Sequence, residues 1–265
     1  MSVNDWLHDL PLPWMALVVF GFTYLLSAVI SAVVAALAAG GRAKSFKAMS
    51  QSMLPVLGII FGLFVAFIAA QVWSDNDHAT ATVSREASAI RSAIVFAAAF
   101  PGEPETKLRG LIRDYAQEAA AVEWPQMAKR TASLKVLPPR QLTEALQLSL
   151  SLPAASTGQQ IAQRQITTAI ESALDARRQR IIVSLAGVSL VKWWCLYLQA
   201  ACVLFAIGLV HCDDRLASLM AMSLFATGAA AAVLMIAAYD RPFIGQLSIK
   251  PDLLLQIMPD VPAGR

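Results

Sequence analysis

Residue types that could bind a metal ion gather at two places in the chain. Residues 75–78 read Asp-Asn-Asp-His, and residues 211–214 read His-Cys-Asp-Asp. An Asp-x-Asp pair supplies few of the roughly six to eight oxygens that calcium takes. Four consecutive side chains cannot easily converge on one ion either. We therefore predict a solvated helix exit at the first place, a loop at the second, and neither a metal site nor a cofactor.

The residues needed for catalysis are also missing. The chain has no GxSxG, no glycine-rich phosphate loop, no HExxH and no CxxC, and it has only three histidines. Acid–base chemistry therefore has few groups to use. The net charge is +3, and no basic run is interleaved with aromatic residues, as it would be on a nucleic-acid-binding surface. The sequence predicts neither an enzyme nor a nucleic-acid-binding protein.

The elements that hold these residues belong in a membrane. The chain is 57% hydrophobic and 15% charged, against about 45–50% and about 25% in soluble domains. Four windows without charge are each long enough to cross a bilayer. We predict an all-α integral membrane protein with four transmembrane helices and a helical extramembrane region between helices two and three. The predicted spans are about 13–39, 53–73, 190–211 and 216–239, with the helical region at about 74–189, in a single domain covering 1–265.

Helical periodicity and its breakers divide the region between the second and third spans. The second span should continue as an amphipathic helix to about Phe100. Trp124-Pro125 should kink or end a later helix, and a helix from about Gln159 should run straight into the third span. Further breaks are predicted at Pro101–Pro104, Pro138–Pro139 and Pro153–Gly158.

The second span has two different sides. A small-residue ridge would let another helix backbone come close, whereas a bulky side that leads to a polar and acidic end could line a pore. The helix-packing candidates are Gly58, Gly62, Ala66 and Ala70. The pore-lining candidates on the bulky side are Leu57, Phe61, Phe64, Ile68, Gln71 and Asp75.

Charged residues at two span ends allow two interpretations each. Lys192 can snorkel at the interface beside Trp193 and Trp194, or it can face an aqueous vestibule on a permeation path. Asp240 and Arg241, followed by a proline, can mark the end of the fourth span. Alternatively, they can pair with charges of a neighbouring subunit.

Several motifs resemble the bestrophin-like family of bacterial membrane proteins of unknown function, which is distantly similar to bestrophin ion channels. The resemblance covers about residues 55–251. Its specific parts are Glu123-Trp124-Pro125 and Asp240-Arg241-Pro242-Phe243-x-Gly245. Weaker matches are Gly62-Leu63-x-Val65-Ala66-Phe67-x-Ala69-Ala70-x-Val72-Trp73, Asp77-x-Ala79 and Arg85-Glu86-Ala87.

The resemblance implies four spans, a helical cytosolic region and a pentameric ion channel in which the second helix of each subunit lines a hydrophobic neck. Matching the Leu57-Gly58 pair to the family would place Ile59 at the neck, whereas helical geometry selects the bulky side instead. The acidic cluster that binds calcium after the last span of animal bestrophins is absent here.

Two functional hypotheses follow. One is a homo-oligomeric channel for small inorganic ions in the bacterial inner membrane. The alternative is a non-conducting scaffold, sensor or accessory subunit that binds a partner through its helical region. An excess of Lys and Arg on the side of the termini predicts that the termini and the helical region are cytoplasmic. Arg42, Lys44 and Lys47 in the first loop argue for the opposite orientation.

Overall fold

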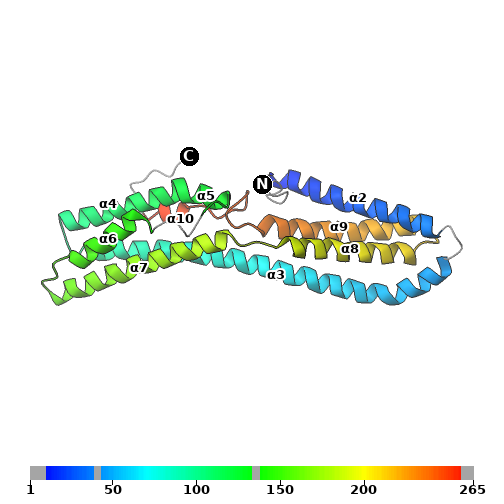
Figure 1. Cartoon of the computed structure of the whole chain (residues 1–265), viewed down its shortest axis with the longest axis horizontal. Coiled ribbons are helices and arrows are strands. Elements are labelled where there is room, and N and C mark those ends of the chain that lie inside the picture. The colour runs from blue at the N-terminus through cyan, green and yellow to red at the C-terminus, as the bar shows by residue number, and fades with distance from the viewer. Residues whose placement is uncertain (1–9, 39–42, 133–137, 258–265) are drawn as a thin grey trace. The chain divides into compact units, whose positions relative to one another are not determined.

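The structure is a computed structural model, and it describes residues 10–38, 43–132 and 138–257. Within these ranges every regular element is a helix, as Figure 1 shows. Four helices are long and apolar enough to cross a membrane. The predicted all-α membrane fold is therefore confirmed. Residue 39, the predicted end of the first span, lies outside the described residues.

The chain forms two compact units. The membrane unit holds the residues up to 74 together with 187–241 and 245–247, and the helical unit holds 75–186, 242–244 and the residues from 248 onward. Helix α3 contributes residues to both units. Each unit has its own apolar core.

The membrane unit contains the four long apolar helices. They are α2 (Leu12–Ala38), α3 (Ala43–Ala97), α8 (Leu190–Val210) and α9 (Arg215–Tyr239). Helix α3 starts before the predicted second span and ends three residues short of Phe100, so its predicted continuation is confirmed. The side chain of Asp214 caps α9 by accepting hydrogen bonds from Leu216 N and Ala217 N.

Close contacts among α2, α8 and α9 build the core of the membrane unit. A Cβ added at Gly208 of α8 would lie 3.1 Å from Val34 Cγ2 of α2, so the glycine permits a close approach of these two helices. Leu196 and Leu204 of α8 and Ala226 of α9 are fully buried between the helices. Large and small apolar residues therefore share the core between these helices.

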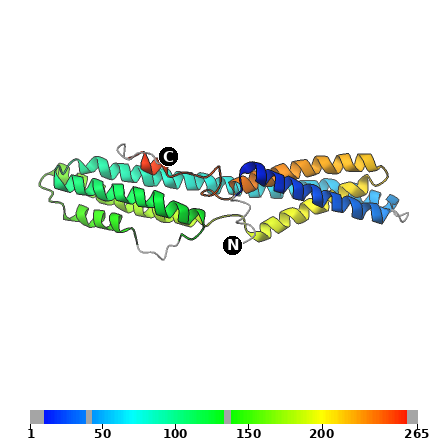
Figure 2. The ribbon, with the colours of Figure 1, turned by 90° about the horizontal axis from the view of Figure 1, so that it is seen from above.

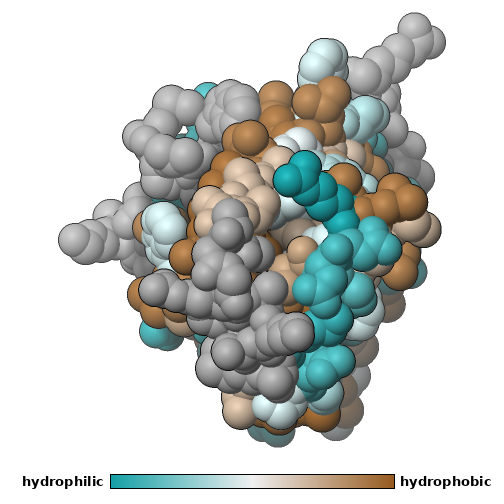
Figure 3. All heavy atoms as spheres, turned by 90° about the vertical axis from the view of Figure 1, so that its right-hand side faces the viewer, coloured by the Kyte–Doolittle hydropathy of each residue, from teal (hydrophilic) through white to brown (hydrophobic). Residues whose placement is uncertain are grey.

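The outer surface of the membrane unit is also apolar. Phe67, Trp194 and Leu224 are 72%, 75% and 78% exposed. Figure 3 shows apolar residues on the outside of one end of the molecule, beside polar ones. A water-soluble monomer rarely exposes so many large apolar side chains. This surface fits contact with lipid tails.

The helical unit consists of further helices that pack on the last part of α3. They are α4 (Glu103–Glu118), the π-helical turn η1 (Ala119–Glu123), α5 (Trp124–Ala128), α6 (Arg140–Ser151), α7 (Thr157–Ser184) and α10 (Asp252–Leu255). Helix α6 packs against both α4 and α7, and Figure 2 shows α6 and α7 from above. The apolar stripes of these helices meet in one core that includes Ile90, Ile112 and Ile166.

The predicted breakers of the helical unit are confirmed at three places. Gly102 has a φ of 101° before α4. Residues other than glycine rarely adopt this backbone conformation. The residues before α6 include Pro139 at its N-cap. Ser156 caps α7, and its side chain accepts a hydrogen bond of 3.2 Å from Gln159 N.

The prediction that α7 runs straight into the third span is wrong. Helix α7 ends at Ser184, and α8 begins at Leu190. Between them, a Cβ added at Gly187 would lie 3.2 Å from Arg241 Cζ. The N–H of Val188 donates to Asp240 Oδ1 over 2.6 Å. The N–H of Val188 is thus bonded to a side chain and not to a carbonyl one helical turn earlier, so the helix is interrupted here. Apolar periodicity in the sequence does not reveal such a contact.

Candidate functional site

The predicted bulky side of α3 packs against other helices of the same chain. Phe61 and Ile68 are 8% and 3% exposed, and the Phe61 ring centroid lies 5.3 Å from that of Phe225 on α9. Leu57 and Phe64 are half-buried and pack against the same core. These side chains leave little surface for a path formed between copies of the chain.

A different row of large apolar side chains is exposed on α3. Ile59, Leu63 and Phe67 are 63%, 55% and 72% exposed. They are spaced four residues apart, which places them along one side of a helix. Ile59 belongs to the predicted lining set. We call these three residues the exposed ridge.

The small-residue ridge does not pack against other helices of the chain. Gly62, Ala66 and Ala70 are exposed, and Gly58 is half-buried. A Cβ added at Gly58 or Gly62 would meet nothing within 4 Å. The close-approach surface that these residues form is thus open in the single chain.

Polar residues follow toward the end of the predicted second span. Gln71 is half-buried, and its Oε1 accepts a hydrogen bond from Lys192 Nζ in the first turn of α8. Asp75 is half-buried as well. The Lys192 ammonium is therefore tied to α3, and this contact is compatible with both interpretations of the lysine.

The helical unit contains a fully buried ion pair. Arg180 of α7 and Glu86 of α3 have no exposed side-chain surface. Arg180 Nε donates to Glu86 Oε2 over 2.7 Å, and Nη2 donates to Glu86 Oε1 over 3.1 Å. Nη2 also reaches Glu123 Oε2 over 2.7 Å. One guanidinium thus joins two carboxylates from different helices, in the forked geometry that arginine favours.

Further partners complete this site. Arg177 Nε donates to Glu123 Oε1 over 2.7 Å, and the Tyr115 hydroxyl donates to Glu86 Oε1. Two carboxylates therefore face two guanidinium groups, and the formal charges balance. We call Glu86, Glu123, Arg177 and Arg180 the buried ion cluster. Buried charges are tolerated only when they are paired and hydrogen-bonded in this way.

A π-helical turn brings Glu123 and Trp124 to the cluster. The N–H of Trp124 bonds to Ala119 O, five residues earlier. Pro125 follows at once; its ring would clash with the carbonyl four residues back in a regular helix, and the wider turn relieves this clash. The predicted kink at Trp124-Pro125 is thus a π turn, and the chain stays helical to Ala128.

The cluster shifts the pKa values of its members. Burial alone would raise the pKa of Glu123, but the charges of Arg180 and Arg177 outweigh burial and lower it. Burial raises the pKa of Tyr115 well above its usual value, and the neighbouring Glu86 carboxylate adds to this effect. Burial alone would lower the pKa of Arg180, but Glu86, together with Tyr115 and Glu123, outweighs burial and raises it. These shifts keep Glu123 and Arg180 charged and the Tyr115 phenol neutral near pH 7.

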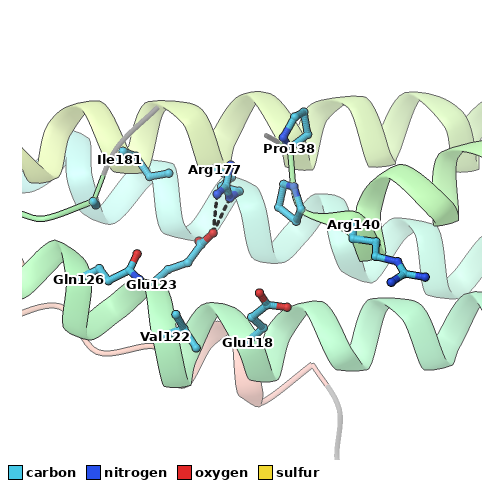
Figure 4. A pocket seen from close by; sticks show the side chains of 10 residues that line it. Glu118, Val122, Glu123, Gln126, Pro138, Arg140, Arg177 and Ile181 are labelled. Atoms are coloured by element: carbon cyan, nitrogen blue, oxygen red, sulfur yellow. Dashed lines mark hydrogen bonds and ion pairs between the residues drawn. The ribbon is translucent and has the colours of Figure 1, made fainter. Parts of the chain in front are cut away.

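A pocket of about 360 Å³ adjoins the cluster. Figure 4 shows Arg177 reaching toward Glu123 at this pocket. Its charged groups are already engaged: Glu118 accepts from Gln141, and Arg140 Nε donates to Glu144 over 2.5 Å. The full lining is Glu118, Val122, Glu123, Gln126, Ala132, Pro138, Pro139, Arg140, Arg177 and Ile181.

The closing motif reaches both units. Asp240 and Arg241, only 3% and 6% exposed, belong to the membrane unit, where Arg241 Nε lies 3.6 Å from Asp240 Oδ2. Pro242 and Phe243 belong to the helical unit. Gly245 has a φ of 85°, which explains a glycine at that position.

The two specific motifs meet at one contact. The rings of Trp124 and Phe243 pack edge to face, with centroids 5.9 Å apart.

Sequence reasoning missed Arg180 and its partner Glu86 as a site. Glu86 interrupts the buried apolar stripe Val83, Ala87 and Ile90, and a lone charge on such a stripe was the available signal.

Residues 75–78 lie within α3, and residues 211–214 connect α8 to α9. Among the described residues, no group of three His, Cys, Asp or Glu side chains could hold an ion. Asp213 instead accepts a hydrogen bond of 2.6 Å from Lys47 Nζ. This contact raises the pKa of Lys47.

Comparisons with known proteins agree with this architecture. The family described as "Bestrophin-like domain" matches residues 21–254. A mutant bacterial bestrophin homologue from Klebsiella pneumoniae has a similar structure, with a TM-score of 0.67 and 12% identity over 90% of this chain and 97% of that chain. A second structure of a Klebsiella pneumoniae homologue, phased by Zn-SAD, also gives 0.67, with 13% identity over 89% and 94%. No curated protein matches the chain. With its family motifs brought together on a bestrophin-type fold, this chain belongs to the bestrophin-like family.

Proposed function

We propose that the protein is a homo-oligomeric channel for small inorganic ions, in which α3 of each subunit lines a hydrophobic neck. The observation that carries this proposal is the exposed ridge, Ile59, Leu63 and Phe67, on a membrane helix without charge between Lys47 and Asp75. A ring of such ridges around an axis would form an apolar constriction, a common channel gate. The bestrophin-like fold makes a pentamer the expected assembly.

The two exposed strips of α3 have different roles in this assembly. The small-residue ridge at Gly62, Ala66 and Ala70 packs against a neighbouring copy, because it lets the backbones approach closely. The exposed ridge then points to the axis. Phe61 and Ile68 from the predicted lining set instead hold α3 against its own subunit.

The proposed orientation places the helical unit and the termini in the cytoplasm of a bacterial cell, with the four spans in the inner membrane. The excess of Lys and Arg near the membrane on that side supports this orientation. Lys192 lies at the start of α8, beside the half-buried Trp193 and the exposed Trp194. Interfacial aromatic residues of this kind mark the membrane boundary.

A flux assay tests the proposal. The purified protein in liposomes should pass chloride or a small monovalent cation down a gradient, and Phe67→Ala should raise the flux because it widens the constriction. Leu224→Ala is the matched control, because Leu224 is equally exposed but lies on α9. Folded oligomers that pass no ion under any gradient or voltage would rule the channel out.

A second candidate function is a non-conducting scaffold, sensor or accessory subunit. Three large apolar side chains of the helical unit, Val95, Leu150 and Ile161, are 62%, 64% and 57% exposed. Contact with another protein would bury these side chains. Recovery of a stoichiometric partner with monomeric or dimeric protein would favour this function over the channel.

A further inference from the structure

Trp124 makes three contacts at once in the helical unit. The Arg180 Cζ lies 4.5 Å from the centroid of the indole ring, a cation–π contact. Phe243 packs against the same ring edge to face. The indole Nε1–H donates to Ile249 O over 2.9 Å. The side chain thus connects the buried ion cluster to the end of the chain.

The segment that Trp124 holds is a short strap, residues 248–257. The N–H of Ile249 donates to Pro242 O over 2.8 Å, and its carbonyl is the acceptor for Trp124. Leu254 of α10 is fully buried in the core of the helical unit. Both backbone groups of Ile249 are therefore bonded to protein groups while the strap is docked.

The position of the indole depends on the π turn, and the π turn carries Glu123. Trp124 N–H bonds to Ala119 O in this turn, and the adjacent Glu123 is held by Arg177 and Arg180. Pro125 opposes a regular α-helix at this point, so the turn that carries Glu123 loosens by unwinding when its contacts are lost. An unwound turn no longer fixes the direction of the indole, and the indole N–H would then move away from Ile249 O.

The geometry points to Trp124 as a positioning residue that couples docking of the C-terminal strap to the buried ion cluster. The strap stays docked while Glu123 is held by both arginines, and a loss of that charge releases it through the π turn. Thermodynamic coupling is reciprocal. Loss of the Trp124 contacts therefore loosens the turn as well. This coupling goes beyond ion conduction and holds whether or not the protein is a channel.

Hydrogen exchange of the full-length protein in detergent micelles tests the coupling. Glu123→Gln, which does not touch the strap, should speed exchange of the Ile249 amide by about tenfold or more, the effect of losing a buried charge-assisted contact. Glu144→Gln removes the exposed ion pair with Arg140 and should leave that amide unchanged. The proposal is overturned if Glu123→Gln speeds exchange in η1 and α5 but not in the strap.

Trp124→Phe provides an independent test, also in case the first variant does not fold. Phenylalanine keeps a ring over Arg180 but cannot donate to Ile249 O. Exchange should then speed up at two amides. One is the amide of Ile249, and the other is the amide of residue 124, which bonds to Ala119 O in the π turn. Faster exchange confined to the strap would show that the two are not coupled.

Discussion

Arg180 and Trp124 lie in contact, with the guanidinium carbon 4.5 Å from the centre of the indole ring. The same guanidinium binds Glu86 and Glu123. This one side chain therefore joins α3, the π turn and α7 in the core of the helical unit. The helical unit depends on it more than on any exposed ion pair.

Replacing Arg180 should strongly destabilise the helical unit. Arg180→Met leaves the fully buried Glu86 without its arginine and leaves Glu123 with Arg177 alone, which costs about 3–5 kcal/mol of unfolding free energy. Thermal unfolding of the purified protein, followed by circular dichroism, should show a large fall in the midpoint. Arg140→Gln is the control, because this arginine is 89% exposed and should leave the midpoint unchanged. Equal midpoints for both variants would contradict the importance given to the cluster.

Stability should fall in acid because of Glu123. Its pKa is lowered in the folded protein from the ordinary 4.5, mainly because the two arginines outweigh burial. The carboxylate therefore contributes stability that is fully present above pH 4.5 and is lost as the pH falls through the lowered pKa.

Glu123→Gln should flatten this part of the pH profile. The comparison is the unfolding midpoint of the wild type and the variant between neutral pH and about pH 3. The variant should start lower and lose less on acidification. Parallel curves of unfolding midpoint against pH would mean that the pKa of Glu123 does not differ between the folded and unfolded states.

The small-residue ridge should control assembly. Gly62→Leu places a bulky side chain where copies are proposed to approach closely, so the oligomer should dissociate or change size, as measured by light scattering in detergent. Within a single chain, the change should be neutral or stabilising by about 1 kcal/mol, since leucine favours helix over glycine.

Gly21→Leu is the matched control for assembly. An added Cβ at Gly21 of α2 also meets nothing within 4 Å, so its helix gains the same propensity. The control should keep the assembly of the wild type. If both variants form the same assembly, the small-residue ridge does not lie in the interface between copies.

The sequence predicted the membrane fold well because its signals are strong and local. Runs without charge located all four spans, and Ser156 and Gly102 mark helix ends that turn chemistry predicts. The side of α3 that faces its own subunit was not predictable. Both sides of this helix are apolar, so hydrophobic periodicity gave no contrast between Phe61, which is buried, and Phe67, which is exposed.

The buried ion cluster could be predicted only in part. The Glu123-Trp124-Pro125 motif marked the place, and Pro125 indicated a distorted helix. The pairing of Glu86 with Arg180 joins residues 94 positions apart, and no local pattern specifies such a contact. The break at Gly187 was missed for the same reason, because its cause is a side chain from the end of α9.

The central claim is that the exposed ridge of α3 lines the neck of a channel. Cysteine modification of the protein in liposomes, followed by ion flux, tests this claim most directly. In a variant with Cys195, Cys202 and Cys212 replaced by alanine, Leu63→Cys should bind a charged thiol reagent from the aqueous path, and the reagent should change the ion flux strongly. Phe61→Cys, buried in the subunit, should not respond. A strong response at residue 61 with none at residue 63 would contradict the proposed neck.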